Sequence, residues 1–289
     1  MATAWRFLDT GCNDAAFNMA VDEALLLSHE AGHSPPTLRA YTWSTPTLSL
    51  GYAQNVAKEV DVAACRRHGV TLVRRPTGGR AVLHDHEATY SVVMPLRVAD
   101  REASITEHYH RIGLALAAAL RQAGLAVRLE RPSILAAAPR SASPACFTAM
   151  SRYELSATGR KLVGSAQKRG RRSLLQHGSI PLSMDRQRLF ACLRVPGDRR
   201  AQLLGEAYAS MVAVNELTPA PLDAAALHRA LRQGFAECLT DGAELMAGEL
   251  SPAERRLVEE LRHDKYGTAA WNLDGPAAWR QRQSACLTE

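Results

Sequence analysis

Residues 74–93, which read RRPTGGRAVLHDHEATYSVV, decide the fold class of this 289-residue chain. The stretch follows the β-rich segment VTLV and ends in a second β-rich segment, ATYSVV. Between them, Gly78 and Gly79 permit a tight turn whose backbone N–H groups can bind an anion, and the flanking arginines suit a carboxylate or a phosphate. A strand rather than a helix follows the glycines, and GxxxxGK followed by Ser or Thr is absent, so the stretch is neither a Rossmann fingerprint nor a Walker A loop. Taken alone, such a turn occurs in ordinary hairpins as well as in binding sites.

The segments around this stretch predict strands that cluster between helices. We expect a first helix over residues 14–29, with Asp14 as its N-cap, and a second helix that begins at Ser104 and stops at Gly124. From residue 185 onward the pattern is helical. Strands that do not alternate strictly with helices favour an α+β fold with a mixed β-sheet and packed helices over a doubly wound fold. The other β-rich segments are TLRAYTW, TLSLGY, LAVRLE, RYELSAT and KLVGSAQKR on either side of a turn at Gly159, and SLLQHGSIPL.

Length and composition limit the class of protein. Hydrophobic residues make up 46% and charged residues 22%, which excludes a disordered chain, a collagen-like fibre and a coiled-coil rod. No apolar run approaches the ~20 residues that span a bilayer, and the N-terminus lacks the basic start and apolar core of a signal peptide. We therefore expect a cytoplasmic protein with no membrane partner. We expect one domain over residues 1–217 and a C-terminal helical segment over residues 218–289, packed on it.

The charge distribution fits either an acidic partner or a solvated loop rich in arginine. Lysine and arginine total 35 and aspartate and glutamate 29, a formal net charge of +6. A basic patch of this kind attracts an acidic protein or a nucleic acid. Nucleic acid is disfavoured because the chain has no helix-turn-helix, zinc finger or aromatic RNA-binding motif. The basic residues that cluster are Arg160, Lys161, Lys168, Arg169, Arg171 and Arg172.

Three local patterns bear on chemistry. His84 and His86 form a His-x-His pair that could bind a metal, but no further ligands follow at close spacing, so we predict no metal site. The six cysteines include no CxxC pair and are expected to be free thiols; Cys146, between small residues in a long loop, is a candidate nucleophile. Lys161 is a candidate for the cation that lowers the pKa of that thiol, although an exposed lysine on a strand is the commoner case.

In order along the chain, these segments resemble the superfamily of lipoate–protein ligases and octanoyltransferases, whose catalytic domain is related to that of biotin protein ligase. The opening stretch resembles its RRxxGGxxVxHD signature. ACFTAMSRYEL and GRKLVGSAQKRGRRSLLQHGSIPL are similar to the cysteine-dependent, LipM-type octanoyltransferases. The resemblance runs from Trp5 almost to Trp271, including FNMAVDEALL and KYGTAAWN. Thr148, Met150 and Arg152 depart from the pattern next to the cysteine, which concerns loop geometry more than chemistry.

The resemblance implies a role for individual residues. Cys146 corresponds to the nucleophile that forms an acyl thioester. Lys161 corresponds to the lysine that lowers the pKa of the cysteine and contacts the acyl carbonyl. The residues that would bind the acyl substrate are Arg75, Thr77, Gly78, Gly79, His84, Gly164, Ser165 and Ala166.

The resemblance further implies an acyltransferase: an octanoyl-[acyl carrier protein]:protein N-octanoyltransferase, with residues 1–217 as the catalytic domain. The donor would be octanoyl-acyl carrier protein. The acceptor would be a lysine of a lipoyl-domain protein, either the H protein of glycine cleavage or the E2 subunit of a 2-oxoacid dehydrogenase. No cofactor and no nucleic acid would be needed. The alternative is an ATP-dependent lipoate–protein ligase of the same fold; Cys146, Arg80 in place of a third glycine, and the lack of an obvious accessory domain weigh against it.

Overall fold

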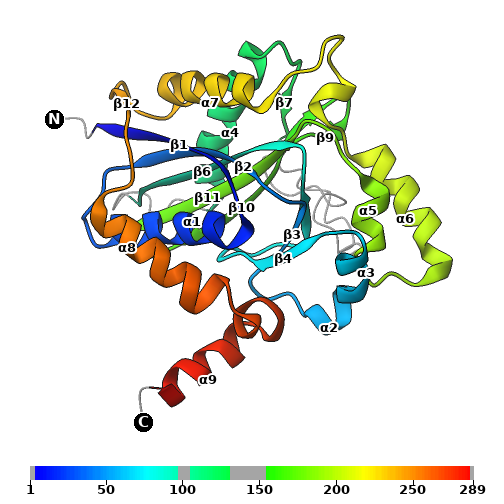
Figure 1. Ribbon diagram of the computed structural model, residues 1–289. Helices are drawn as coiled ribbons and strands as arrows, with labels where there is room; N and C mark the ends of the chain where they lie inside the picture. Colours follow the sequence, from blue (N-terminus) through cyan, green and yellow to red (C-terminus); the bar gives the residue numbers. More distant parts are fainter. Residues whose placement is uncertain (1–3, 97–104, 131–153, 287–289) are drawn as a thin grey trace.

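The computed structural model describes residues 4–96, 105–130 and 154–286, and a six-stranded mixed sheet runs through its centre (Figure 1). The strand order in this sheet is β10-β11-β6-β2-β1-β12. β1 pairs in parallel with β2 and with β12, and the other neighbours are antiparallel. The strands are β1 (Trp5–Asn13), β2 (Thr37–Trp43), β6 (Glu87–Pro95), β10 (Gly164–Arg169), β11 (Ser173–Pro181) and β12 (Leu245–Ala247).

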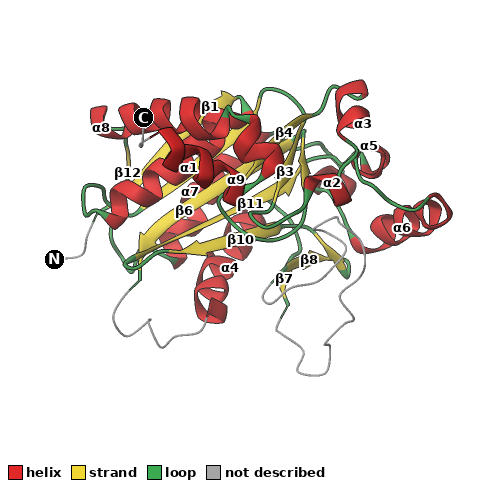
Figure 2. Ribbon diagram, turned by 90° about the horizontal axis from the view of Figure 1, so that it is seen from below, coloured by secondary structure: helices red, strands yellow, loops and turns green. Residues whose placement is uncertain are grey.

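Two smaller sheets contain the remaining strands. In the first, β3 (Thr47–Leu50) lies between β4 (Thr71–Arg74), its parallel neighbour, and β5 (Val82–His84), its antiparallel neighbour. Figure 2 shows the other small sheet below the long strands. Its strands are β7 (Arg128–Leu129), β8 (Leu155–Ala157) and β9 (Arg160–Lys161). The predicted α+β class with a mixed sheet is confirmed.

Helices cover both faces of the large sheet (Figure 1). α4 (Ile105–Gln122) and α7 (Ala224–Cys238) pack on one face, and α1 (Ala15–Glu30) with α8 (Pro252–Leu261) packs on the other. The remaining helical elements are α2 (Val56–Glu59), α3 (Val62–Arg67), α5 (Arg186–Ala191), α6 (Gly197–Ser210) and α9 (Pro276–Cys286), with short helical turns η3 (Val214–Glu216), η4 (Arg262–Tyr266) and η5 (Ala270–Asp274). No helix in the described part of the chain has the length and apolar character to cross a membrane.

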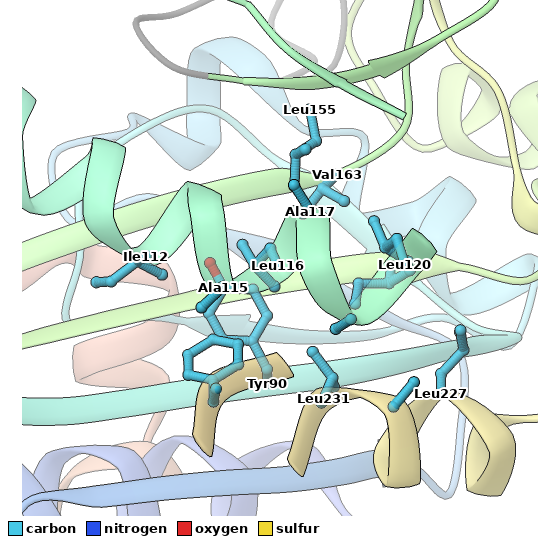
Figure 3. Packing of buried hydrophobic residues seen from close by; sticks show 14 of the residues in the cluster. Tyr90, Ile112, Ala115, Leu116, Ala117, Leu120, Leu155, Val163, Leu227 and Leu231 are labelled. Atoms are coloured by element: carbon cyan, nitrogen blue, oxygen red, sulfur yellow. The ribbon is translucent and has the colours of Figure 1, made fainter. Parts of the chain in front are cut away.

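The main core lies between the sheet, α4 and α7. Figure 3 shows Leu116 and Leu120 of α4 facing Leu231 and Leu227 of α7, close to the sheet, with Ile112 one turn further along α4. Helical spacing of three or four residues puts each set on one face of its helix, as the sequence pattern of α4 and α7 predicts. Burial of each such side chain stabilises the fold by roughly 1.5–3 kcal/mol, so this layer fixes the sheet against the two helices.

The predicted helix boundaries are confirmed where the structure describes them. The Asp14 carboxylate caps α1 and accepts a hydrogen bond from the backbone N–H of Phe17 at 2.7 Å. α4 ends at Gln122, and Gly124 follows with a positive φ of 86°, a conformation that glycine adopts without strain. Ser104, the predicted start of α4, lies outside the described residues.

The segment KLVGSAQKR, predicted as one strand, forms two. β9 ends at Lys161 and pairs with β8, whereas β10 begins at Gly164 and pairs with β11 in the large sheet. Leu162 and Val163 lie between the two strands, and the backbone N–H groups of both donate to the Leu155 carbonyl, so the regular ladder stops here. The one-strand prediction was wrong, and Lys161 and Gly164 lie in different sheets.

Two strands of the large sheet have no counterpart in the prediction. β1 precedes the first helix, and β12 interrupts the region predicted as helical from residue 185 onward. β12 has only three residues, too few to carry an alternating pattern. It forms because Leu245 pairs with Trp5 at the edge of the sheet, a contact between distant parts of the chain.

The C-terminal part of the chain is hydrogen-bonded to β4, the strand that precedes the loop with Gly78 and Gly79. The Arg74 guanidinium, buried at the end of β4, donates to the carbonyl oxygens of Trp271 (3.0 Å) and Asn272 (3.3 Å). In return, the Trp271 indole N–H donates to the Arg74 carbonyl at 2.8 Å. Residues 218–289 also supply β12, α7 and α8 to the layers described above. The boundary between residues 217 and 218 stays a prediction.

Candidate functional site

A cavity lies between the large sheet and the β4-β3-β5 sheet. Five of the ten predicted site residues line the cavity, and they come from both sheets: Arg75, His84, Gly164, Ser165 and Ala166. The apolar part of the lining is formed by Met19, Tyr41, Trp43 and Val82. The lining thus combines apolar side chains with the polar groups of Arg75 and His84.

A second, more open pocket lies beside the loop that contains Gly78 and Gly79. Thr77, Gly78 and Gly79 line it from one side, and Gln167 and Lys168 of β10 line it from another. The predicted loop residues thus face this open pocket, whereas Arg75 and His84 face the enclosed cavity. The two spaces share β10, because Gly164 and Ser165 line the cavity a few residues before Lys168.

Arg75 holds the glycine loop in shape. Its Nε and Nη2 donate to the Gly78 carbonyl at 3.2 and 2.7 Å, and Nη2 also donates to the Arg80 carbonyl at 2.7 Å. Nη1 donates to the carbonyl (3.0 Å) and hydroxyl (3.1 Å) oxygens of Ser49. A guanidinium has five N–H groups, and these bonds engage all of them. The Arg75 donors thus serve the loop backbone and Ser49, and the role of Arg75 in substrate binding stays a prediction.

His84 braces the same loop through Ser49. Its Nε2 lies 2.7 Å from the Ser49 hydroxyl, and its Nδ1 lies 2.9 Å from the Glu87 carboxylate. The imidazole stacks on Trp43 with ring centroids 4.2 Å apart. His86 is exposed, so the two histidines do not share a face. Among the described residues, no group of His, Cys, Asp and Glu side chains could hold a metal ion.

A second histidine, His177 of β11, joins the cavity to the open pocket. Its Nε2 lies 2.7 Å from the Thr77 hydroxyl, and its Nδ1 lies 2.8 Å from the carboxylate of Asp22 in α1. Asp22 is fully buried and also accepts from Arg39 at 2.7 Å and from Ser91 at 2.7 Å.

Sequence reasoning gave Asp22 no role. The signal in the sequence was the Asp22 carboxylate among the apolar residues of FNMAVDEALL, because a buried charge needs hydrogen-bonding or oppositely charged partners.

The charge states of Asp22 and His177 follow from their surroundings. Burial would raise the pKa of the Asp22 carboxyl, but Arg39 and the hydrogen bond from His177 outweigh burial and hold the pKa below its usual range. Burial lowers the pKa of His177 below its ordinary value, although Asp22 opposes this. At neutral pH Asp22 is therefore a carboxylate and His177 a neutral imidazole. With Nδ1–H directed at Asp22, Nε2 of His177 accepts the hydrogen bond from Thr77.

Lys161 lies in the small sheet, outside the residues that line the cavity. Its ammonium is buried and forms an ion pair with the Glu154 carboxylate at 2.5 Å. Lys161 is therefore no part of an exposed basic patch, contrary to the expectation from charge clustering. Cys146 lies outside the described residues, as do Thr148, Met150 and Arg152.

Gly51, at the end of β3, keeps space open for the glycine loop, and we expect its replacement to destabilise the protein. A Cβ at Gly51 would lie 1.9 Å from the Gly79 carbonyl oxygen, a backbone atom that cannot rotate away. Gly51→Ala is expected to lower the free energy of unfolding by about 1–3 kcal/mol, the usual effect of overpacking. Chemical denaturation measures this. Gly78→Ala is the matched control, because a Cβ at Gly78 meets no atom within 4 Å; equal stability of the two variants would contradict the steric argument.

Comparison with known families places most of the chain in one sequence family. Residues 14–236 match the model of the lipoyl protein ligase A/B catalytic domain. The chain is 48% identical over 273 residues to octanoyltransferase LipM of Kyrpidia tusciae, covering 93% of this chain and 98% of that protein. It is 39% identical to octanoyltransferase LipM of Bacillus subtilis, covering 93% and 97% of the two chains.

Solved structures have the same fold. A bipartite lipoate protein ligase of Thermoplasma acidophilum, studied with its E2 lipoyl domain, superposes with a TM-score of 0.78 at 25% identity, over 94% of this chain and 96% of that one. A lipoate-protein ligase A bound with ATP superposes with a TM-score of 0.75 at 26% identity, over 93% and 98% of the two chains.

Proposed function

The chain belongs to the family of lipoyl protein ligase A/B catalytic domains and is an octanoyltransferase of lipoate biosynthesis, and we propose that it takes its octanoyl group from octanoyl-acyl carrier protein. The octanoyl group then passes, through a cysteine thioester, to a lysine of a lipoyl domain. The observation that carries this is the 39–48% identity to octanoyltransferases over 93% of the chain. The reaction would take place in the cytoplasm.

In the first step, the Cys146 thiolate attacks the thioester carbonyl of the donor. A tetrahedral oxyanion forms and collapses, the carrier thiolate leaves, and octanoyl-Cys146 remains. Lys161 would stabilise the thiolate and the oxyanion as a fixed cation. Support for this role comes from its burial beside the start of β10, where a charge is little screened by water.

In the second step, the lysine amine of the acceptor attacks the octanoyl thioester. The C–N bond forms, the C–S bond breaks, the amine loses a proton, and the Cys146 thiolate is regenerated. Both steps need the octanoyl carbonyl held still while its partners change. A narrow apolar cavity does this by immobilising the chain attached to the carbonyl.

The enclosed cavity is the proposed octanoyl site. Tyr41, Trp43 and Met19 offer it apolar surface, and Gly164, Ser165 and Ala166 line its β10 side. The glycine loop at Thr77, Gly78 and Gly79 would border the reacting end of the acyl group, where the open pocket admits the arm of the carrier protein or the acceptor lysine.

The proposed docking surface for acidic partners is the turn between β10 and β11. Arg171 and Arg172 are exposed there, while their backbone N–H groups donate to Glu30 at 2.8 Å. Lys168 lines the open pocket and lies 3.4 Å from Glu23. An acidic carrier protein or lipoyl domain, such as the H protein or an E2 subunit, would be attracted to this turn.

A comparison of donors tests the proposal against the ligase alternative. With octanoyl-acyl carrier protein and a lipoyl domain, intact-mass spectrometry is expected to show octanoylation of the lipoyl domain. With free octanoate and Mg-ATP, no octanoylation is expected. Modification only in the second mixture would assign the chain to the ATP-dependent ligases.

The Thermoplasma ligase fold alone does not decide this, because ligases and transferases share it. Arg80, where ligases usually have a third glycine, and the presence of Cys146 favour the transferase.

A further inference from the structure

Two buried cysteines, Cys65 and Cys192, contact each other in the apolar cluster that packs on the β4-β3-β5 sheet. Cys65 lies in α3, and Cys192 directly follows α5. The Cys65 thiol lies 3.8 Å from the Cys192 carbonyl oxygen and is hydrogen-bonded to the Cys192 thiol. Both are free thiols, and neither lines the enclosed cavity or the open pocket. The transfer reaction therefore gives this pair no task.

The backbone holds the two cysteines together independently of their side chains. The Asp61 N–H donates to the Cys192 carbonyl at 2.9 Å, and Val60 and Leu193 form an antiparallel bridge. A disulfide forms without backbone movement only where the two chain segments are already close and the Cβ atoms face each other. Paired backbones and thiols in contact meet both conditions.

We propose that Cys65 and Cys192 are an oxidative modification site, at which hydrogen peroxide converts the two thiols into a reversible disulfide. The inference stands on the contact of the side chains and on the backbone pairing of their segments. It is independent of the proposed octanoyl transfer and of Cys146.

The two sulfurs have different roles in the step. The hydrogen bond from Cys65 lowers the pKa of the Cys192 thiol and Arg188 lowers it further, although burial opposes them. The same hydrogen bond, together with burial, raises the pKa of Cys65. Because the thiolate is the reactive form of cysteine, Cys192 attacks the oxidant and Cys65 completes the disulfide.

The reaction balances with one molecule of hydrogen peroxide. The Cys192 thiolate attacks a peroxide oxygen, the O–O bond breaks, hydroxide leaves and Cys192 becomes a sulfenic acid. The Cys65 sulfur then attacks the sulfenic sulfur, the S–S bond forms, the S–O bond breaks and a second hydroxide leaves. The two thiol protons and the two hydroxides make two molecules of water. Two thiols are oxidised and the peroxide is reduced.

Burial restricts which oxidant reaches the pair. The exposed fraction of Cys65 is 1% and that of Cys192 is 0%. However, α3 has only six residues, and a helix of this length opens locally at low cost. Peroxide is small and uncharged, so it enters such an opening more readily than a large, charged oxidant does.

The disulfide would fix one wall of the open pocket. Glu59 lines that pocket, and its carbonyl accepts from the Arg194 N–H at 3.0 Å, two residues after Cys192. Its carboxylate accepts from Nε2 of Gln54, which also lines the pocket, at 2.8 Å. The linked residues are 127 positions apart, and a crosslink over so long a loop constrains the unfolded chain strongly.

Peptide mapping of the full-length protein tests for the disulfide. The folded protein is treated with hydrogen peroxide, catalase removes the excess, and the remaining thiols are blocked with N-ethylmaleimide in denaturant before digestion with trypsin. We expect the peptides EVDVAACR (59–66) and LFACLR (189–194) as a linked pair that dithiothreitol separates. If both peptides carry N-ethylmaleimide while the exposed Cys12 is oxidised, or if Cys65 is linked to another cysteine, the proposal is wrong.

Thermal unfolding separates this disulfide from other oxidation. Peroxide treatment should raise the unfolding temperature of the wild-type chain by about 5 °C, and dithiothreitol should reverse the rise. Cys65→Ala and Cys192→Ala should each abolish the rise. Cys238→Ala is the matched control and should keep it, because Cys238 is an exposed thiol in α7. A rise that persists in Cys65→Ala would exclude the pair, and the mapping of wild-type protein decides the matter even where a variant fails to fold.

Discussion

Replacing Cys146 with alanine is expected to abolish octanoyl transfer, with a loss of about 10⁶-fold, the scale seen when an enzyme loses its nucleophile. The proposed pathway has no other group that forms the covalent intermediate, so both steps stop. After incubation with octanoyl-acyl carrier protein, intact-mass spectrometry should show the octanoyl adduct on the wild-type chain and none on Cys146→Ala. A lipoyl domain added afterwards should stay unmodified.

Other cysteines provide the controls. Cys12 and Cys238 are exposed free thiols, whereas Cys65 and Cys192 are buried in the core around α3 and α5. Cys12→Ser and Cys238→Ser should each leave transfer unchanged. If Cys146→Ala still transferred octanoyl at the wild-type rate while another cysteine carried the adduct, the nucleophile would be misassigned.

Replacing Lys161 with alanine is expected to reduce both stability and transfer. Its ammonium is 2% exposed and lies 2.5 Å from Glu154, which is itself 6% exposed. Removing one member of a buried ion pair leaves an uncompensated charge and costs about 3–5 kcal/mol in unfolding free energy. Losing one stabilising contact to the oxyanion costs about 10²–10³-fold in rate. Denaturation and single-turnover transfer measure the two effects.

A double variant separates the structural role of Lys161 from the catalytic one. Lys161→Met together with Glu154→Leu removes both charges at similar volume, a change that is often neutral for stability. Stability should return towards the wild-type value while transfer stays low. The pH at which iodoacetamide alkylates Cys146 should also move upward, because the proposed mechanism assigns Lys161 as the cation that lowers the pKa of that thiol. Recovery of transfer in the double variant would show that Lys161 acts only as the ion-pair partner of Glu154.

The local sequence determined most of the elements. The cap at Asp14, the positive-φ glycines at 124 and 159, and the periodic apolar faces of α4 and α7 depend on residues only a few positions apart. Elements made by distant pairing were missed. β12 exists because it meets β1 some 240 residues earlier in the chain, and the break after Lys161 exists because β9 and β10 pair with different partners.

The sequence by itself determined the family resemblance, the α+β class and five residues that line the cavity, because those follow from ordered motifs and short-range patterns. Only the tertiary structure decided what each of those residues does. Arg75 and Arg74 look like anion ligands in the sequence, yet their donors are taken by carbonyl groups of the loop and of the C-terminal part. Lys161 looks exposed, yet it is paired with Glu154.

The array of Asp22, Thr77 and His177 shows the physical reason. Each of the three residues is unremarkable in its own segment, and Thr77 and His177 are 100 positions apart. Their contacts depend on the register of β11 against β6 and on the packing of α1 across both strands. A buried polar group must find a partner, but which partner it finds is determined by strand register and packing, and neither is written in the neighbouring residues.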